Sequence, residues 1–291
     1  MVMNSSNRSA FTLVEILVAT AITLVLTSLI LSLTTNVLTT WNRASGKLLS
    51  GSDARLALQL LTQDLETAVL QYDGSQWIIA EQDSDVGILP EKNAFWLQFF
   101  SPVTDRPSYY QNTKTDVYGD ICAVSYRLAY QNPFGNPDGL KVYGLYRTVA
   151  DPQTTFEDAL VYANSENQNF RSFWSMGDYN KGRAEQEFLV GNVVNFSFIF
   201  QYEVTDEEGS IQRYLSTDDQ QNPVEFYFGG ENSMGTPQYV DITLTILSEE
   251  GMQQMQNLET LGSFTEAELK DIIEQYGHTY IQREAFLAKP L

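Results

Sequence analysis

The sequence predicts an α+β protein, in which a long N-terminal helix, first hydrophobic and then amphipathic, packs on a mainly antiparallel β-sheet head. Three observations predict it. Residues 16–33 are largely apolar, and no charged residue lies between Glu15 and Arg43. Beyond this run, apolar residues recur at helical spacing as far as Val69. From Tyr72 onwards, short runs of β-forming residues are separated by Gly, Pro, Asn and Asp.

The first half of the predicted helix has the length and composition of a membrane span. Residues 16–33 approach the length that crosses a bilayer, and the threonines and serines among them can bond back to helix carbonyls. A secretory signal peptide is one alternative, but Arg8 is the sole basic residue ahead of the run and no clear cleavage site follows it. An ordinary signal anchor would leave Glu15 unexplained, because an unpaired carboxylate at bilayer depth is strongly unfavourable.

The second half of the predicted helix is amphipathic. Its apolar side is predicted at Leu56, Leu60, Leu61, Leu65, Ala68 and Val69. Its solvent side is predicted at Asp53, Arg55, Gln59, Asp64 and Glu66. Gly46 and Gly51 are places where the helix could bend, and Ser52 or Asp53 could cap a helix that restarts there. Continued to about Gln71, the whole helix would be roughly 90 Å long.

The remainder of the chain is predicted to form the head. Strands are predicted at residues 94–100, 121–130, 141–149, 193–202, 224–227 and 239–247. The turn-rich segment 132–139 predicts a hairpin between the second and third of these strands. Residues 151–183 are predicted to form a partly helical excursion over the surface. A last helix, residues 265–275, has Thr265 and Glu268 at the spacing of a capping box.

Composition excludes several classes of function. With 17 basic and 37 acidic residues the formal charge is −20, which opposes binding to nucleic acid. The one histidine, His278, is predicted at a surface or helix end, and the one cysteine, Cys122, in the core of a strand. No Gly-x-Gly-x-x-Gly, Walker or His-Glu-x-x-His motif is present, so neither a cofactor nor a catalytic relay is expected.

Acidic residues of the head raise the possibility of a structural calcium ion, because carboxylate oxygens are the ligands this ion prefers. The candidates are Asp83, Asp85, Asp116, Asp120, Asp206, Glu207, Glu208, Asp218 and Asp219. None has the spacing of an EF-hand, and residues 205–210 are predicted to form a hairpin turn. Solvated charge is therefore the preferred interpretation. The aromatic runs 95–100 and 196–200 are predicted to lie in the sheet core.

The segment Phe11-Thr12-Leu13-Val14-Glu15 resembles the N-terminal motif of type IV pilins and type II secretion pseudopilins. The resemblance implies cleavage by a prepilin peptidase between Ala10 and Phe11 and N-methylation of Phe11. It also implies that Glu15 meets the terminal amine of a neighbouring subunit's Phe11 and so fixes the axial register of a filament. Ala10 departs from the glycine usual before the cut, which bears on the efficiency of cleavage.

The same resemblance divides the chain into a leader at residues 1–10, a transmembrane and filament-core segment at 11–42, an amphipathic segment at 43–71 and a periplasmic head at 72–291. The strand sequences, including Leu145-Tyr146-Arg147, resemble the J-type minor pseudopilin, and the C-terminal segment 279–291 resembles prepilin-like cassette proteins. The expected protein is a non-enzymatic minor subunit, held in the bacterial inner membrane, at the tip of a pseudopilus for protein secretion.

Its expected partners are the prepilin peptidase, other minor pseudopilins or pilins, and the inner membrane, with no nucleic acid. Three other functions remain open. A minor pilin of a type IV pilus, serving adhesion or competence, would have the same N-terminus. A membrane-anchored periplasmic binding domain would need neither Phe11 nor Glu15. A secreted enzyme on an unusual anchor would need catalytic residues around His278.

Overall fold

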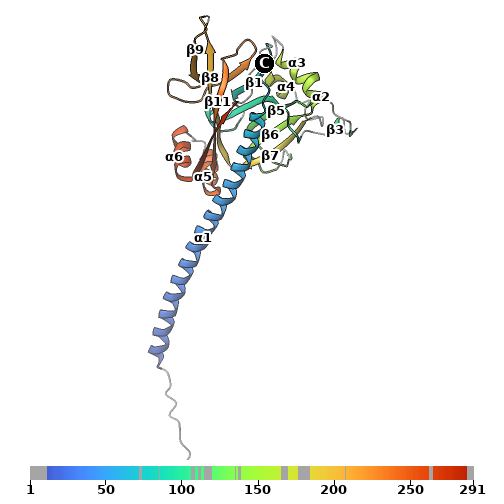
Figure 1. Ribbon diagram of the computed structural model, residues 1–291. Coiled ribbons are helices and arrows are strands. Elements are labelled where there is room, and N and C mark those ends of the chain that lie inside the picture. Colours follow the sequence, from blue (N-terminus) through green and yellow to red (C-terminus); the bar gives the residue numbers. More distant parts are fainter. Residues whose placement is uncertain are drawn as a thin grey trace, which may run out of the picture. The chain divides into compact units, whose positions relative to one another are not determined.

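The structure of the protein is a computed structural model, and the chain divides into two compact units, Met1–Leu48 and Leu49–Leu291. Helix α1, Leu13–Glu66, has residues in both units (Figure 1). The described residues are 12–71, 74–84, 86–105, 109–110, 113–114, 120–134, 136, 139–164, 170–175, 184–206, 208–261 and 265–286.

Helix α1 differs from the prediction at its middle and at its end. Residues 46–53 are all helical, so neither Ser52 nor Asp53 caps a restarted helix. The helix ends at Glu66, before the predicted Gln71, because the chain then joins the sheet of the head. The backbone N–H of Val69 donates to a carbonyl of the neighbouring strand at 2.8 Å and no longer to its own helix.

Within the second unit, the C-terminal part of α1 packs on the head through one face. Its buried residues recur at helical spacing and are Ala54, Ala57, Leu58, Leu61, Asp64 and Leu65. Leu56 was predicted to be buried and is 64% exposed, and Asp64 was predicted to be in solvent and is 5% exposed. Leu56 is exposed because the buried face of the helix is the one that carries Ala54 and Ala57. Asp64 is buried because it pairs with Arg147 of the sheet, as described below.

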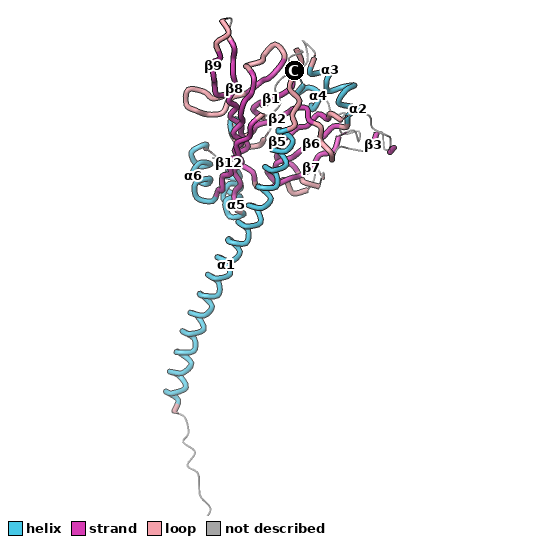
Figure 2. The backbone as a smooth tube through the Cα atoms, viewed as in Figure 1, coloured by secondary structure: helices cyan, strands magenta, loops and turns pink. Residues whose placement is uncertain are grey.

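The larger sheet of the head has six strands in the order β10-β1-β2-β5-β6-β7, with every neighbouring pair antiparallel. Figure 2 shows its strands β1, β2, β5, β6 and β7 in magenta. The strands are β1 Gln76–Gln82, β2 Phe95–Ser101, β5 Cys122–Gln131, β6 Val142–Ala150, β7 Ala184–Gly191 and β10 Phe226–Gly229. The predicted hairpin between β5 and β6 is confirmed. Strands β1 and β7 were not predicted.

The second sheet has four strands in the order β12-β11-β8-β9, again antiparallel throughout. They are β8 Val193–Thr205, β9 Ile211–Leu215, β11 Thr236–Leu247 and β12 Gly277–Ala285. Two short strands, β3 Tyr109–Tyr110 and β4 Thr113–Lys114, pair with each other. The turn predicted at residues 205–210 connects β8 to β9, whereas β9 and β12 themselves were not predicted.

Helices α5, Glu249–Leu261, and α6, Glu266–Tyr276, lie between β11 and β12 in the chain. The capping box predicted at the start of α6 is confirmed: the Thr265 side chain accepts from the backbone N–H of Glu268, and the Glu268 carboxylate accepts from the backbone N–H of Thr265 at 2.8 Å. Helix α5 was not predicted. A single 3-10 turn, Glu91–Asn93, precedes β2.

The excursion predicted over the surface contributes to the core instead. It contains α2 Pro152–Thr154, a π-helical turn Thr155–Ala159, α3 Leu160–Ala163 and α4 Phe170–Ser175. Phe170, Phe173 and Trp174 are buried, and the ring of Phe170 stacks on that of Phe100 with 4.5 Å between centroids. The prediction failed because these aromatic residues stand among polar ones, with too little periodicity to mark a buried face.

The aromatic runs 95–100 and 196–200 contribute to the core, as the sequence predicted, and their rings also join the two sheets. All seven residues of β2 are buried, and so are Phe196, Phe198 and Phe200 of β8. The ring of Phe95 meets that of Phe198 edge to face at 6.2 Å, and Phe200 stacks on Phe226 at 4.2 Å. These contacts confirm an α+β fold whose core lies between antiparallel sheets.

Gly229, at the end of β10, is expected to be intolerant of a side chain. Its φ is +85°, and a Cβ built on it would lie 1.9 Å from the carbonyl oxygen of Ser75. Gly209 has a similar φ of +81° but nothing within 4 Å of such a Cβ. We expect Gly229→Ala to destabilise the fold by about 3 kcal/mol or more and Gly209→Ala by about 1–2 kcal/mol. Urea denaturation of the two variants measures the difference, and equal losses would show that the contact with Ser75 has no effect.

Candidate functional site

The N-terminal candidate site begins at Thr12, the residue before the first residue of helix α1. The backbone N–H and the hydroxyl of Thr12 both donate to Oε2 of Glu15, each at 2.9 Å, and the backbone N–H of Glu15 donates to Oγ1 of Thr12 at 3.3 Å. This reciprocal pattern is that of a capping box. The spacing Thr-x-x-Glu that predicted the cap of α6 is also present here and could have predicted this one.

One carboxylate oxygen of Glu15 accepts no hydrogen bond from the described residues. Both bonds from Thr12 go to Oε2, and within the described residues no donor reaches Oε1. Ala10 and Phe11, the predicted cleavage site, lie outside the described residues. The geometry therefore assigns Glu15 a role within its own helix end and leaves half of its carboxylate accessible.

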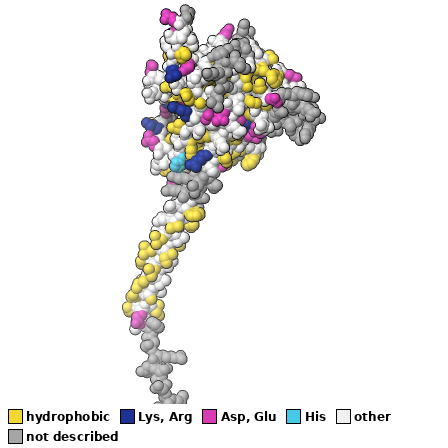
Figure 3. Space-filling view, viewed as in Figure 1, with side chains coloured by type: hydrophobic (Ala, Val, Ile, Leu, Met, Phe, Trp, Pro, Cys, Tyr) yellow, Lys and Arg dark blue, Asp and Glu magenta, His cyan; other side chains and the backbone are white. Residues whose placement is uncertain are grey.

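The helix that follows is long and apolar enough to cross a membrane. The candidate span is Leu13–Leu38, and its side chains are all exposed in the isolated chain. Figure 3 shows hydrophobic side chains, in yellow, along this part of α1. The hydroxyls of Thr20, Thr23, Thr27 and Thr34 each donate to a carbonyl three or four residues earlier, at 2.7 to 2.9 Å. Their polar atoms are thus satisfied inside the helix, which makes the segment compatible with lipid.

A second candidate site is a buried ionic cluster that joins α1 to the larger sheet. Arg147 of β6 is fully buried and binds Asp64 of α1 through Nε–Oδ2 at 2.8 Å and Nη2–Oδ1 at 3.3 Å. The same guanidinium binds both oxygens of Asp105, at 2.6 and 3.0 Å. The hydroxyl of Tyr126, on β5, donates to Oδ2 of Asp64 at 2.7 Å. Glu187 of β7 lies 3.5 Å from Nη1.

In this cluster, burial and the neighbouring charges shift the pKa values of Asp64 and Arg147 in opposite directions. Burial raises the pKa of Asp64, against the hydrogen bonds from Arg147 and Tyr126. Hydrogen bonds from Arg147 lower the pKa of Asp105, which is half-exposed. Burial also raises the pKa of Tyr126 well above its ordinary value, so its hydroxyl stays protonated and donates. For Arg147, burial lowers the pKa but Asp105, Tyr126 and Asp64 outweigh it, and the guanidinium stays charged. The cluster is suited to holding the helix on the sheet.

The opposite face of the larger sheet carries a second arrangement of charges around Trp96. The guanidinium of Arg127 lies 4.5 Å from the ring centroid and that of Arg171 lies 5.4 Å away. Arg127 pairs with Asp83, and Arg171 pairs with Glu81 at 3.1 Å. Each charge is balanced by an opposite one, so this arrangement connects β1, β5 and α4.

The calcium candidates that lie within the described residues are not gathered into a site. Asp206 accepts hydrogen bonds from the backbone of its own turn, and Asp218 does the same in the next turn. Asp85, Asp116 and Glu207 lie outside the described residues. Over the described ranges, no group of three or more His, Cys, Asp or Glu side chains could hold a metal ion. His278, predicted at a surface or helix end, is the second residue of β12 and is half-buried. It is not joined by any described serine or cysteine nucleophile in a hydrogen-bonded relay.

Cys122 is fully buried at the start of β5, which confirms the predicted core position. Its burial removes the thiol from solvent.

Comparison with known proteins identifies the N-terminal part. Residues 5–31 match the family model of the prokaryotic N-terminal methylation motif. Curated proteins give no match. Among solved structures, a type IV-like pilin from Thermus thermophilus is similar with a TM-score of 0.35 and 8% identity, over 81% of this chain and 95% of that one. The chain therefore carries a prokaryotic N-terminal methylation motif at its N-terminus.

Proposed function

We propose that the chain is a non-enzymatic prepilin-like subunit that assembles with other pilin-like subunits into a filament of the bacterial envelope. The match of residues 5–31 to the N-terminal methylation motif carries this proposal. A prepilin peptidase cleaves between Ala10 and Phe11 and the new terminus is methylated. The subunit is held in the inner membrane by residues 11–42, and its head, residues 72–291, lies in the periplasm.

The geometry at Glu15 supports assembly through the N-terminus. Its Oε2 is occupied by Thr12, whereas Oε1 is open to a donor from outside the described residues. The terminal amine of Phe11 on a neighbouring subunit is such a donor. In an apolar helix bundle this pair neutralises two charges, and a shift in axial register would leave both unpaired. Glu15 accordingly fixes the register of the subunit.

The finer role we propose is that of a minor pseudopilin at the tip of a periplasmic pseudopilus for protein secretion. Support comes from the J-type resemblance of the strand sequences and from the large acidic head, which is unsuited to DNA capture. A minor pilin of a type IV pilus is the second candidate, since it would carry the same N-terminal motif. An anchored periplasmic binding domain is the third, and it alone would function without Phe11 and Glu15.

The mature N-terminus tests the proposal. We expect the full chain, produced together with its cognate prepilin peptidase, to begin at N-methylated Phe11 by mass spectrometry. Without the peptidase it should begin at residue 1 or 2. Ala10→Gly should give the same product at an equal or higher rate, because glycine is the usual residue before the cut. A chain that stays uncut, or is cut after the apolar run, would contradict the proposal and indicate a plain anchor or a secreted domain.

A further inference from the structure

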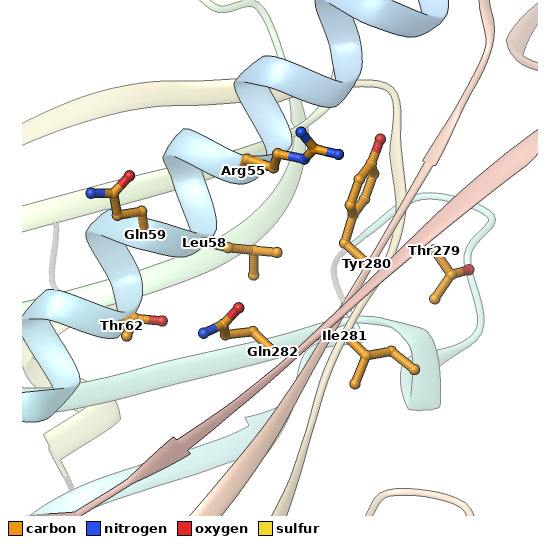
Figure 4. A pocket seen from close by; sticks show the side chains of 8 residues that line it. All are labelled: Arg55, Leu58, Gln59, Thr62, Thr279, Tyr280, Ile281 and Gln282. Atoms are coloured by element: carbon orange, nitrogen blue, oxygen red, sulfur yellow. The ribbon is translucent and has the colours of Figure 1, made fainter.

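A groove runs between α1 and β12 on the head. It has a volume of about 560 Å³ and is open to solvent on one side. Figure 4 shows α1 on one side and β12 on the other, with Tyr280 and Gln282 directed toward the helix. Its lining residues are Arg55, Leu58, Gln59 and Thr62 of α1 and Thr279, Tyr280, Ile281 and Gln282 of β12.

The strand that borders the groove is a sheet edge. Among the described strands β12 pairs with β11 alone, so the backbone groups along its other side have no strand partner. Ile281, in the middle of β12, is 70% exposed. An exposed edge of this kind is a template for pairing with another extended chain.

Arg55 gives the groove an uncompensated positive charge. The other arginines whose side chains are described each pair with a carboxylate, and they are Arg127, Arg147, Arg171, Arg213 and Arg283. Arg55 is exposed and has no ion pair among the described residues, in a chain with a formal charge of −20. Because the chain has many carboxylates and none of the described ones pairs with Arg55, this arginine is available to bind an acidic group of another molecule.

A second polar group of the groove also lacks a partner. Oγ1 of Thr62, which lines the groove, is buried and makes no hydrogen bond within the described structure, and the same is true of Nε2 of His278, the residue before the groove's Thr279. His278 lies on the same side of β12 as Tyr280 and Gln282, by the alternation of the strand. The Tyr280 hydroxyl fills the space over Gly51, where a Cβ would lie 2.9 Å from it. Leu58 adds an apolar floor between these groups.

We propose that this groove binds an extended segment of a different protein, which adds as a strand to the free edge of β12. The segment presents a carboxylate to Arg55 and an apolar side chain to Leu58. The backbone N–H and C=O groups of the segment pair with those along the free edge of β12, and its carboxylate complements the charge of Arg55. The occupant is thus an acidic strand of a partner polypeptide, and the inference does not depend on processing at Phe11.

Two other occupants fit less well. A second copy of this chain offers the free edge of β9, Ile211–Leu215, but that strand carries no carboxylate for Arg55, and its Arg213 already pairs with Glu203. The free edge of β7 carries Glu187, which already lies against Arg147. The residue after β12, Phe286, donates its backbone N–H to Gln238 and stacks on Phe200. The chain therefore leaves β12 on the side of β11, away from the free edge.

Site-specific cross-linking in the host cell tests the proposal. The photoreactive residue p-benzoylphenylalanine replaces Gln282 in the full chain, and the cross-linked peptide is identified by mass spectrometry. We expect one adduct, to a segment of another protein that contains Asp or Glu. Arg55→Glu should reduce its yield by about tenfold, which corresponds to the loss of one favourable charge contact. Changing the acidic residue of that segment to lysine should restore the yield in the Arg55→Glu background.

The control is Lys141→Glu, which makes the same change of charge at an exposed residue just before β6 and should leave the yield unaltered. Arg55→Glu should unfold at the same urea concentration as the parent, because Arg55 is exposed and unpaired. An adduct to a second copy or to the chain's own C-terminal residues would overturn the proposal. So would the absence of any adduct, or a yield indifferent to Arg55→Glu. A normal start at Phe11 in the same sample would show that such a failure concerns the groove alone.

Discussion

Replacing Arg147 by alanine is expected to lower the free energy of unfolding of the head by about 3–5 kcal/mol. The guanidinium is fully buried and binds both oxygens of Asp64, which is itself 5% exposed. Without it, Asp64 remains as a buried charge with the Tyr126 hydroxyl as its remaining partner. Urea denaturation of the full chain in detergent, followed by tryptophan fluorescence, measures the loss.

Two further variants test whether the loss of stability comes from the burial of the ion pair or would follow the loss of an exposed pair as well. Arg283→Ala removes an arginine that binds Asp241 at 2.6 Å in the second sheet, but that arginine is 66% exposed and its loss should change stability little. The double variant Asp64→Leu, Arg147→Met replaces the buried pair with apolar side chains and should recover much of the stability. If Arg147→Ala cost no more than Arg283→Ala, the cluster would not be what holds α1 on the sheet.

Asp64 shows where sequence reasoning failed in the head. A carboxylate in an amphipathic helix is normally on the solvent side, and its partner Arg147 lies 83 positions further along the chain. Nothing in the spacing of either residue indicates the other, because the pairing depends on how the sheet is ordered. The hairpin between β5 and β6 was predictable, by contrast, since a turn-rich segment connects two adjacent apolar strands.

The strands missed by the sequence are mostly edge or near-edge strands. All five residues of β9 are exposed, and β12 has no fully buried residue, so neither shows the alternation of apolar and polar residues that marks a half-buried strand. The groove beside β12 was unpredictable for the same reason. It is formed by residues 55–62 and 279–282, which only the fold brings together.

The N-terminal motif could be predicted from the sequence because the residues that form it are close together in the chain. A carboxylate at the start of an apolar run is conspicuous in any sequence, and Phe11 and Glu15 are only four positions apart in the chain. The structure adds the capping box with Thr12, which gives Glu15 a function inside its own subunit. A loss of assembly in Glu15→Ala would therefore have two explanations, a lost cap or a lost charge.

Three substitutions at this end distinguish the cap from the charge. Glu15→Gln keeps an oxygen that can accept from Thr12 but removes the charge, since glutamine also forms capping boxes. Thr12→Val removes the capping hydroxyl and keeps the charge of Glu15. Glu15→Ala removes both. If pairing with a neighbour's Phe11 amine fixes the register, Glu15→Gln and Glu15→Ala should both abolish filament assembly, and Thr12→Val should retain most of it.

Assembly is measured by the amount of subunit recovered in sheared or cross-linked filaments, normalised to the amount of mature subunit in the membrane. Processing should remain normal in the three variants, because residues 1–11 are unchanged. Normal assembly of Glu15→Gln together with loss in Thr12→Val would assign Glu15 to capping and exclude the register pairing. Normal assembly of Glu15→Ala would exclude both roles, because the subunit would then enter the filament with neither the capping carboxylate nor its charge.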